Sequence, residues 1–221
     1  MSSRSTKTWV IVFVLAIIVF IPMRCYMGAS VAGKVIDADT QKPIAGVTVL
    51  AHWEVETGGY ADEHGCVWQM AIEEAVTDDD GRFRLPSWGP RFSGCLLFPG
   101  FSPGRSPRIF LFKSGYKLQI LENGYPSPDG SSFVGMIRHS IWDGQTTPMA
   151  TFSGTPKEYA RHLTLLTLYL SLMIESSRNG RALLETMPLM LKALNDQRRD
   201  FELKNIRSFN LPDADAGLGN K

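Results

Sequence analysis

The side chains of this sequence that are able to bind a soft metal are His52, His64, Cys66, His139 and His162. One residue separates His64 from Cys66, and no second pair at metal-ligand spacing accompanies them. A zinc site needs further ligands of this kind, so we interpret His64 as a loop histidine and Cys66 as a disulfide cysteine. The sequence therefore predicts neither a metal nor a cofactor.

The carboxylates and hydroxyls do not form a catalytic pattern either. Asp78–Gly81 lacks the further oxygen ligands of the helix–loop–helix calcium motif and is typical of a tight turn. Glu73 and Glu74 are adjacent, so on a strand they point to opposite faces and cannot act as a pair. Ser93 and Ser153 each precede a glycine without the strand and helix that flank a nucleophilic serine. We expect no catalytic residues and a protein that is not an enzyme.

The N-terminus indicates export. Arg4 and Lys7 precede an apolar run, Trp9–Ile21, and small residues follow at Ser30–Ala32. The run is shorter than the roughly 20 residues of a straight membrane span, so a cleaved signal peptide and a retained anchor both stay open. A lipid on Cys25 is a third alternative, disfavoured because Met and Arg precede that cysteine. We expect a protein of the cell envelope, either membrane-anchored or periplasmic or secreted.

The cysteines and the net charge limit the compartment and the classes of partner that we expect. In an oxidising compartment, Cys66 and Cys95 form a candidate disulfide, and two free, buried thiols are the alternative. The formal net charge of the 221 residues is +1, which excludes a global electrostatic case for nucleic acid. The partners we expect are the membrane, through the N-terminal segment, and an envelope protein or glycan.

Residues 31–122 read as an all-β unit. In Val47–Trp53, alternate residues beginning with Val47 share one face, as in a half-buried strand. The turn Asp78–Gly81 joins two further runs as a hairpin, and we interpret Trp88–Pro107 as a loop. The strands predicted in this way are Val31–Asp37, Val47–Trp53, Ala71–Thr77, Arg82–Leu85, Arg108–Phe112, Lys117–Glu122 and, as a last strand, Phe133–Ile141.

The pattern changes to helix near Thr155. Thr155–Glu158 is a capping box with proline at the first helical position. An apolar face follows at helical spacing, formed by Leu163, Leu166, Leu170 and Ile174. We expect this helix to pack on the sandwich or on its neighbour, and a second membrane span is the alternative. A second helical stretch runs from Arg181 to about Asn205, bent or restarted at Pro188.

The strand and turn residues resemble those of the carboxypeptidase regulatory-like domain, a transthyretin-like β-sandwich. The matching positions are Gly33, Val35, Asp37, Pro43, Ile44, Gly46, Val47, Val49, Thr77, Asp78, Gly81, Phe83, Leu85 and the Lys113–Tyr116 corner. Their physical roles are structural: Pro43 fixes a turn, Gly46 and Gly81 allow the chain to reverse, Asp78 favours a turn, and Phe83 fills the space between sheets. The stretch Thr57–Gln69 departs from the pattern as a long insertion, and the helices lie outside it.

We therefore predict an all-β Greek-key sandwich (transthyretin-like) with an N-terminal apolar signal or anchor helix and C-terminal α-helices. The expected parts are a signal peptide or anchor (1–30), the sandwich (31–122), an extension with an extra strand (123–154), a helical segment (155–207) and a disordered tail (208–221). We expect this module to bind, to scaffold or to assist envelope assembly.

Two alternatives of other classes stay open. One is a carbohydrate-binding module that uses Trp53, Trp68 and Trp88, whose other interpretation is packing in the core or anchoring of loops. The other is a metal-binding or enzymatic protein that uses residues 57–66.

Overall fold

The strands of the sandwich begin at Cys25, six residues before the expected boundary. The computed structural model describes residues 9, 25–57, 67–92, 101–102, 107–124, 133–134, 137–175 and 180–206. The expected N-terminal signal or anchor helix and the tail 208–221 therefore lie almost wholly outside the described residues. In the part of the chain that is described, no helix combines the length and the apolarity that a membrane crossing requires.

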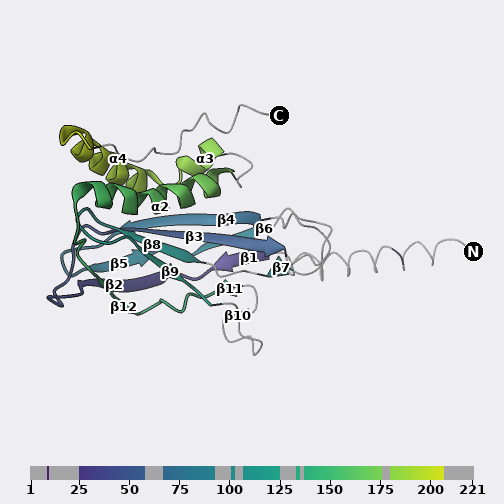
Figure 1. Ribbon diagram of the computed structural model, residues 1–221. Helices are drawn as coiled ribbons and strands as arrows, with labels where there is room; N and C mark the ends of the chain where they lie inside the picture. Colours follow the sequence, from purple (N-terminus) through teal and green to yellow (C-terminus); the bar gives the residue numbers. More distant parts are fainter. Residues whose placement is uncertain are drawn as a thin grey trace, which may run out of the picture.

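The described strands form three sheets (Figure 1). The first sheet has the order β10 (Phe133–Val134), β11 (Ile137–Arg138), β1 (Cys25–Gly28) and β6 (Trp88–Phe92). The second has the order β12 (Thr146–Met149), β2 (Val31–Asp37) and β5 (Arg82–Leu85). The third has the order β4 (Val67–Val76), β3 (Thr48–Thr57), β8 (Arg108–Phe112) and β9 (Gln119–Glu122), and β7 (Phe101–Ser102) also pairs with β3.

An inner core joins the second and third sheets. Val35 of β2 and Leu85 of β5 are buried in one cluster with Val49 of β3 and Ile109 of β8. Strand β3 contributes alternate residues to this core, because successive side chains of a strand point to opposite faces. Its other face, which includes Leu50, belongs to a second cluster. The prediction of a β-sandwich is confirmed at this level.

The C-terminal helices cover the other face of the third sheet (Figure 1). Helix α2 (Pro156–Glu175) starts at the predicted capping box, where Thr155 N donates to Glu158 Oε2 at 2.8 Å and Glu158 N donates to Thr155 Oγ1 at 3.3 Å. This helix buries three leucines, Leu163, Leu166 and Leu170. They belong to one apolar cluster with Leu50 and Phe110 of the sheet. The expectation that this helix packs on the sandwich is confirmed.

Helix α4 (Pro188–Leu203) follows the short helix α3 (Gly180–Leu184) and restarts at Pro188 as predicted. It buries Met190, Leu194 and Phe201 in the same cluster as α2. The ring of Phe201, near the end of α4, lies 5.8 Å from the ring of Tyr159, near the start of α2. The two helices therefore form one apolar layer over the third sheet.

The predicted hairpin around Asp78–Gly81 is wrong. Strand β5 pairs with β2, in the second sheet, whereas β4 pairs with β3 in the third. The hydroxyl of Thr77 ends β4 by accepting Val47 N at 2.8 Å and donating to Ile44 O at 2.7 Å. The chain then crosses between sheets at Asp78–Gly81, because Gly81 O is held by Val35 N of β2 at 2.8 Å.

Four described strands were not predicted, β1, β6, β7 and β12, and two of them, β6 and β12, contain proline. Trp88–Phe92, predicted as part of a loop, is β6, and it contains Gly89 and Pro90. Thr146–Met149 is β12, contains Pro148 and follows the segment predicted to be last. Within the described sheets both strands lie at an edge, where a residue without an N–H group is tolerated. The predicted strand Phe133–Ile141 is divided between β10 and β11, which pair with each other.

Candidate polar site

A row of polar side chains crosses the helix-facing side of the third sheet. His52 of β3 is paired with Arg108 of β8, and Arg108 is paired with Glu122 of β9. Residues paired directly across strands share a face, so the register alone places these three side chains together. Glu54, two positions after His52, adds a carboxylate from β3. We call these four residues the polar site.

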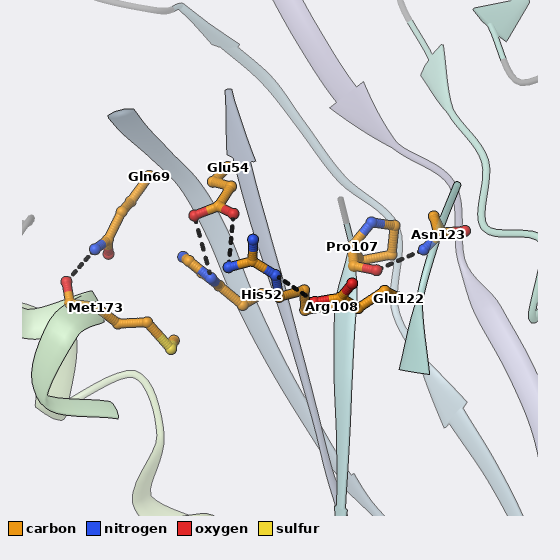
Figure 2. A network of polar contacts seen from close by, with 8 residues as sticks. All are labelled: His52, Glu54, Gln69, Pro107, Arg108, Glu122, Asn123 and Met173. Carbon is orange, nitrogen blue, oxygen red and sulfur yellow. Dashed lines mark hydrogen bonds and ion pairs between the residues drawn. The ribbon is translucent and has the colours of Figure 1, made fainter. Parts of the chain in front are cut away.

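Arg108 bridges the two carboxylates of the polar site (Figure 2). Its Nη1 lies 3.0 Å from Glu54 Oε1, and its Nε lies 3.3 Å from Glu122 Oε1. Glu54 is buried, and Arg108 and Glu122 are partly buried. A buried carboxylate is costly without a partner, so the guanidinium compensates a charge that the fold has removed from water.

His52 is uncharged within this site. Its side chain is 1% exposed, and burial together with the positive charge of Arg108 lowers its pKa to about 3. Its Nδ1 lies 3.8 Å from Glu54 Oε2, and among the described residues neither ring nitrogen has a hydrogen-bond partner. The contact with Glu54 is therefore one between a neutral imidazole and a carboxylate, and not an ion pair.

Amide side chains tie this end of the sheet to neighbouring segments (Figure 2). Gln69 of β4 donates to the carbonyl of Met173, near the end of α2. Asn123, which follows β9, donates to the carbonyl of Pro107, and its Oδ1 accepts Ile141 N at 2.7 Å. These contacts connect β4 with α2 and β9 with the turn at residue 141, so the side chains around the polar site hold backbone in place.

The arrangement of the polar site favours a structural role, in which it holds the strands together, over the binding of a ligand. Both carboxylates face one guanidinium, and the imidazole is closed off from solvent. Across the described residues, no three His, Cys, Asp or Glu side chains are grouped so that they could hold a metal ion. The polar site can accordingly fix the register of β3, β8 and β9 at the end of the sheet.

The histidines and cysteines singled out from the sequence are not brought together where they are described. His52 is in the polar site, His139 is exposed, and His162 of α2 accepts Leu118 N at 2.9 Å. His64, Cys66 and Cys95 lie outside the described residues, and with them the candidate disulfide and residues 58–66 of the predicted loop, whereas Thr57 is the last residue of β3.

The tryptophans proposed for glycan binding are core residues where they are described. Trp53 and Trp88 are buried, and their rings meet edge to face with centroids 5.8 Å apart. They offer no exposed ring on which a sugar could stack, so this part of the carbohydrate hypothesis is wrong. The side chain of Trp68 lies outside the described residues.

The residues assigned to turns and core occupy the corners between sheets. Gly46 and Gly81 have φ values of +70° and +71°, in the left-handed region that favours glycine. Asp78 Oδ1 accepts Asp80 N at 3.0 Å and Arg82 N at 2.8 Å, which closes the turn. Pro43 is exposed and forms an isolated antiparallel β-bridge with Ile36. Phe83 is buried in the inner core.

One surface feature was missed in the sequence. Leu165, Leu168 and Leu172 of α2 are 46%, 53% and 51% exposed, on the side of the helix opposite its buried leucines. Their spacing of three and four residues is the signal that could have found them, because it marks a second apolar stripe on one helix. We call these three residues the leucine stripe.

Comparisons with known proteins leave the chain without an assigned family. No protein-family model matches it, and no curated protein matches it. Similar solved structures include 3-chlorocatechol 1,2-dioxygenase from Rhodococcus opacus 1CP (13% identity, TM-score 0.31, 58% of this chain and 60% of that one). A second example is a 9R-lipoxygenase from Cyanothece PCC8801, with 14% identity and a TM-score of 0.27 over 70% of this chain and 24% of that one. A third is chlorocatechol 1,2-dioxygenase from Pseudomonas putida, with 16% identity and a TM-score of 0.29 over 58% of this chain and 61% of that one. The chain thus spans less than two thirds of each of these proteins, and likenesses at these TM-scores carry no argument about it.

Proposed function

We propose that this protein is a non-enzymatic β-sandwich module, exported or anchored in the cell envelope, that binds or scaffolds through its helical layer. The observation that carries this proposal is the leucine stripe. Leu168 and Leu172 are more than half exposed, although the same helix buries Leu163, Leu166 and Leu170 completely. A row of exposed leucines along one helix is typical of a contact surface.

The polar site supports binding or scaffolding over catalysis. A catalytic acid or base has to reach a substrate, and the imidazole of His52 is 1% exposed and uncharged. Glu54 and Glu122 both face Arg108, at 3.0 Å and 3.3 Å from its guanidinium nitrogens. The ionisable groups of the polar site are thus engaged with one another.

The resemblance to the carboxypeptidase regulatory-like, transthyretin-like sandwich belongs to the same proposal. Two of its glycine positions, Gly46 and Gly81, have the positive φ that the motif would require. Two further motif positions are in contact, since Tyr116 Oη donates to Asp37 Oδ2 at 3.1 Å. The two φ values and this hydrogen bond support the resemblance at positions far apart in the sequence.

Two measurements test the proposal in the envelope. Fractionation with N-terminal sequencing of the mature protein should recover it from the envelope, either cleaved or with its apolar N-terminal run retained. Native electrophoresis of mild-detergent extracts at native expression should show a complex larger than the monomer. Replacing all three stripe leucines by serine should remove the complex, whereas Leu203→Ser, a change at an 84% exposed leucine of α4, should leave it. A wild-type protein that migrates as a monomer would refute the binding role.

A further inference from the structure

Strand β1 joins two other strands of the first sheet, and it begins four positions after the apolar N-terminal run, residues 9–21. It lies between β11 and β6 in that sheet (Figure 1). Met27 is paired with Ile137 of β11 in parallel register. Tyr26 is paired with Arg91 of β6 in antiparallel register. Without β1, the strands β11 and β6 would lose the partner that joins them.

Close packing fixes β1 to β6 and to the inner core. A Cβ atom at Gly28 would overlap the indole ring of Trp88. A Cβ atom at Gly89 of β6 would lie 2.8 Å from Tyr26 O. The ring of Trp88 in turn meets the buried ring of Trp53 edge to face, and Tyr26 packs against the same core. The two strands therefore approach each other as closely as they do because both positions are glycine.

The start of β2 is part of the fold as well. Val31 is 1% exposed and is paired with Leu85 of β5. Ala32 N donates to Asp143 Oδ1 at 2.8 Å, and Gly144 N donates to Ala32 O at 2.8 Å. Residues 25–28 and 31–32 thus both belong to the folded unit.

The positions at which a signal peptidase would cut lie inside this unit. The enzyme reads two small residues separated by one position. After the apolar run, the first pairs of this kind are Gly28 with Ser30 and Ser30 with Ala32. A cut after Ser30 removes all of β1, and a cut after Ala32 also removes Val31 from the core. Either cut would therefore take away residues that the fold uses.

Cleavage before Cys25, with a lipid on that cysteine, would keep β1. Lipid attachment needs small residues directly before the cysteine, and here Met and Arg precede it, which disfavours this route. Retention of the apolar run is the arrangement that preserves β1 and agrees with these residues.

We propose that the chain stays uncleaved and that residues 9–21 anchor it in the membrane, with the start of β1 next to the bilayer. This inference rests on the proposed function, since it names the lipid bilayer as a partner of the module and decides between the two forms left open there. Cys25 lies four positions after residue 21, so the start of β1 is within about 14 Å of the apolar run. The first sheet is therefore the part of the described sandwich that lies nearest to the membrane along the chain.

The charges around the apolar run suit a retained anchor. Residues 8–23 carry no charge, and Lys7 and Arg24 flank them. Long basic side chains at the ends of a short apolar run reach the headgroups, which compensates for a length below about 20 residues. Arg4 and Lys7 also give the run the basic start of an export signal. The same segment can thus direct export and then hold the protein in the membrane.

The intact mass of the protein purified from host membranes tests whether the run is retained. We expect the full chain of 24.6 kDa, and we expect it to stay with the membranes in an alkaline carbonate wash. A mature N-terminus at Val31 or Gly33 would overturn the proposal, as would a lipid-bearing N-terminus at Cys25. A full-length chain that the carbonate wash releases would also overturn it.

Gly28→Val tests whether β1 belongs to the folded unit, in full-length protein purified in mild detergent. The valine would overlap the ring of Trp88, so we expect the melting temperature to fall by about 6 °C or more. Gly124→Val is the matched control, because a Cβ atom there meets nothing within 4 Å, and it should melt within about 2 °C of the wild type. If the valine variant does not accumulate, Gly28→Ala takes its place. Equal melting of the variants at positions 28 and 124 would overturn the proposal, because residue 28 would then be dispensable to the fold.

Two combinations of results separate this inference from the proposed function. A full-length protein that resists the carbonate wash but migrates as a monomer in detergent extracts would support the anchor and refute the binding role. A cleaved protein that still forms the complex dependent on the leucine stripe would overturn the anchor and leave the binding role standing.

Discussion

The carboxylate of Glu74 on β4 caps helix α4, accepting the backbone N–H of Met190 at 2.7 Å across 116 positions of the chain. The same carboxylate accepts Leu189 N at 2.9 Å. Met187, the residue at the start of the helix, provides no side-chain cap of its own. A carboxylate also suits the positive end of the helix dipole. Glu74 therefore fastens the outer helical layer to the third sheet.

Replacing Glu74 by alanine should lower the free energy of unfolding by about 1–2 kcal/mol, because two N–H groups of α4 lose their acceptor. Equilibrium denaturation in urea measures this change. Glu185→Ala is the matched control, since it removes the same charge from an exposed position just before α4 and should cost less than about 0.5 kcal/mol. Equal effects of the two changes would show that Glu74 acts by charge alone.

Arg108→Met should be far more costly than Glu122→Gln. The first change leaves the buried carboxylate of Glu54 without the guanidinium at 3.0 Å, a loss of about 3 kcal/mol or more. The second removes a charge whose side chain is 36% exposed, a loss of less than about 1 kcal/mol. The same urea experiment compares the two variants. If their costs are alike, Arg108 does not serve mainly to compensate Glu54.

Local signals in the sequence were sufficient to predict single strands and helices such as β3 and α2. The alternation of β3 depends on neighbours in the chain, and the capping box of α2 depends on Thr155 and Glu158, three residues apart. Signals of this kind are complete within one short segment. They therefore predicted the strand, the helix start and the apolar face of α2 before any partner was known.

Pairings between distant segments could not be predicted in the same way. The hairpin expected at Asp78–Gly81 is a crossing between sheets, because β5 finds its partner in β2 and not in its neighbour β4. The polar site exists only because the register sets His52 beside Arg108, fifty-six positions away. Glu74 looks like an ordinary strand residue until α4 is placed over it. Each of these features depends on a contact that neither segment encodes alone.

The protein should become less stable as the pH falls below about 6.5, in part because of His52. The pKa of this histidine is lowered to about 3 in the folded state from an ordinary value of 6.5, so the unfolded chain binds its proton first. The contribution of neutral His52 is complete above pH 6.5 and is lost between pH 6.5 and about 3, by at most about 1.4 kcal/mol for each pH unit.

His52→Gln should flatten this part of the stability profile, because glutamine does not titrate. The variant and the wild type are compared at each pH, because other groups also titrate in this range. Burial raises the pKa of Glu74, and this shift makes the protein more stable as the pH falls, opposite to the effect of His52. Thermal unfolding from pH 7 to pH 4 gives the profile, and nuclear magnetic resonance of the His52 ring gives the titration directly. A ring signal that titrates with a midpoint near 6.5 in the folded protein would contradict the prediction.

Gly81→Ala should be much more destabilising than Gly115→Ala, although both glycines have a positive φ, +71° and +83°. A Cβ atom at Gly81 would lie 2.4 Å from the carbonyl oxygen of Val35, whereas one at Gly115 would meet nothing within 4 Å. The change at Gly115 should cost only the left-handed backbone strain of about 1–2 kcal/mol. The change at Gly81 adds a clash with the backbone of β2, which forces the crossing between sheets to shift, and we expect a total cost above about 3 kcal/mol. Thermal unfolding of the two variants measures the difference. Similar melting temperatures would show that the Asp78–Gly81 corner yields without disturbing the pairing of β2 with β5.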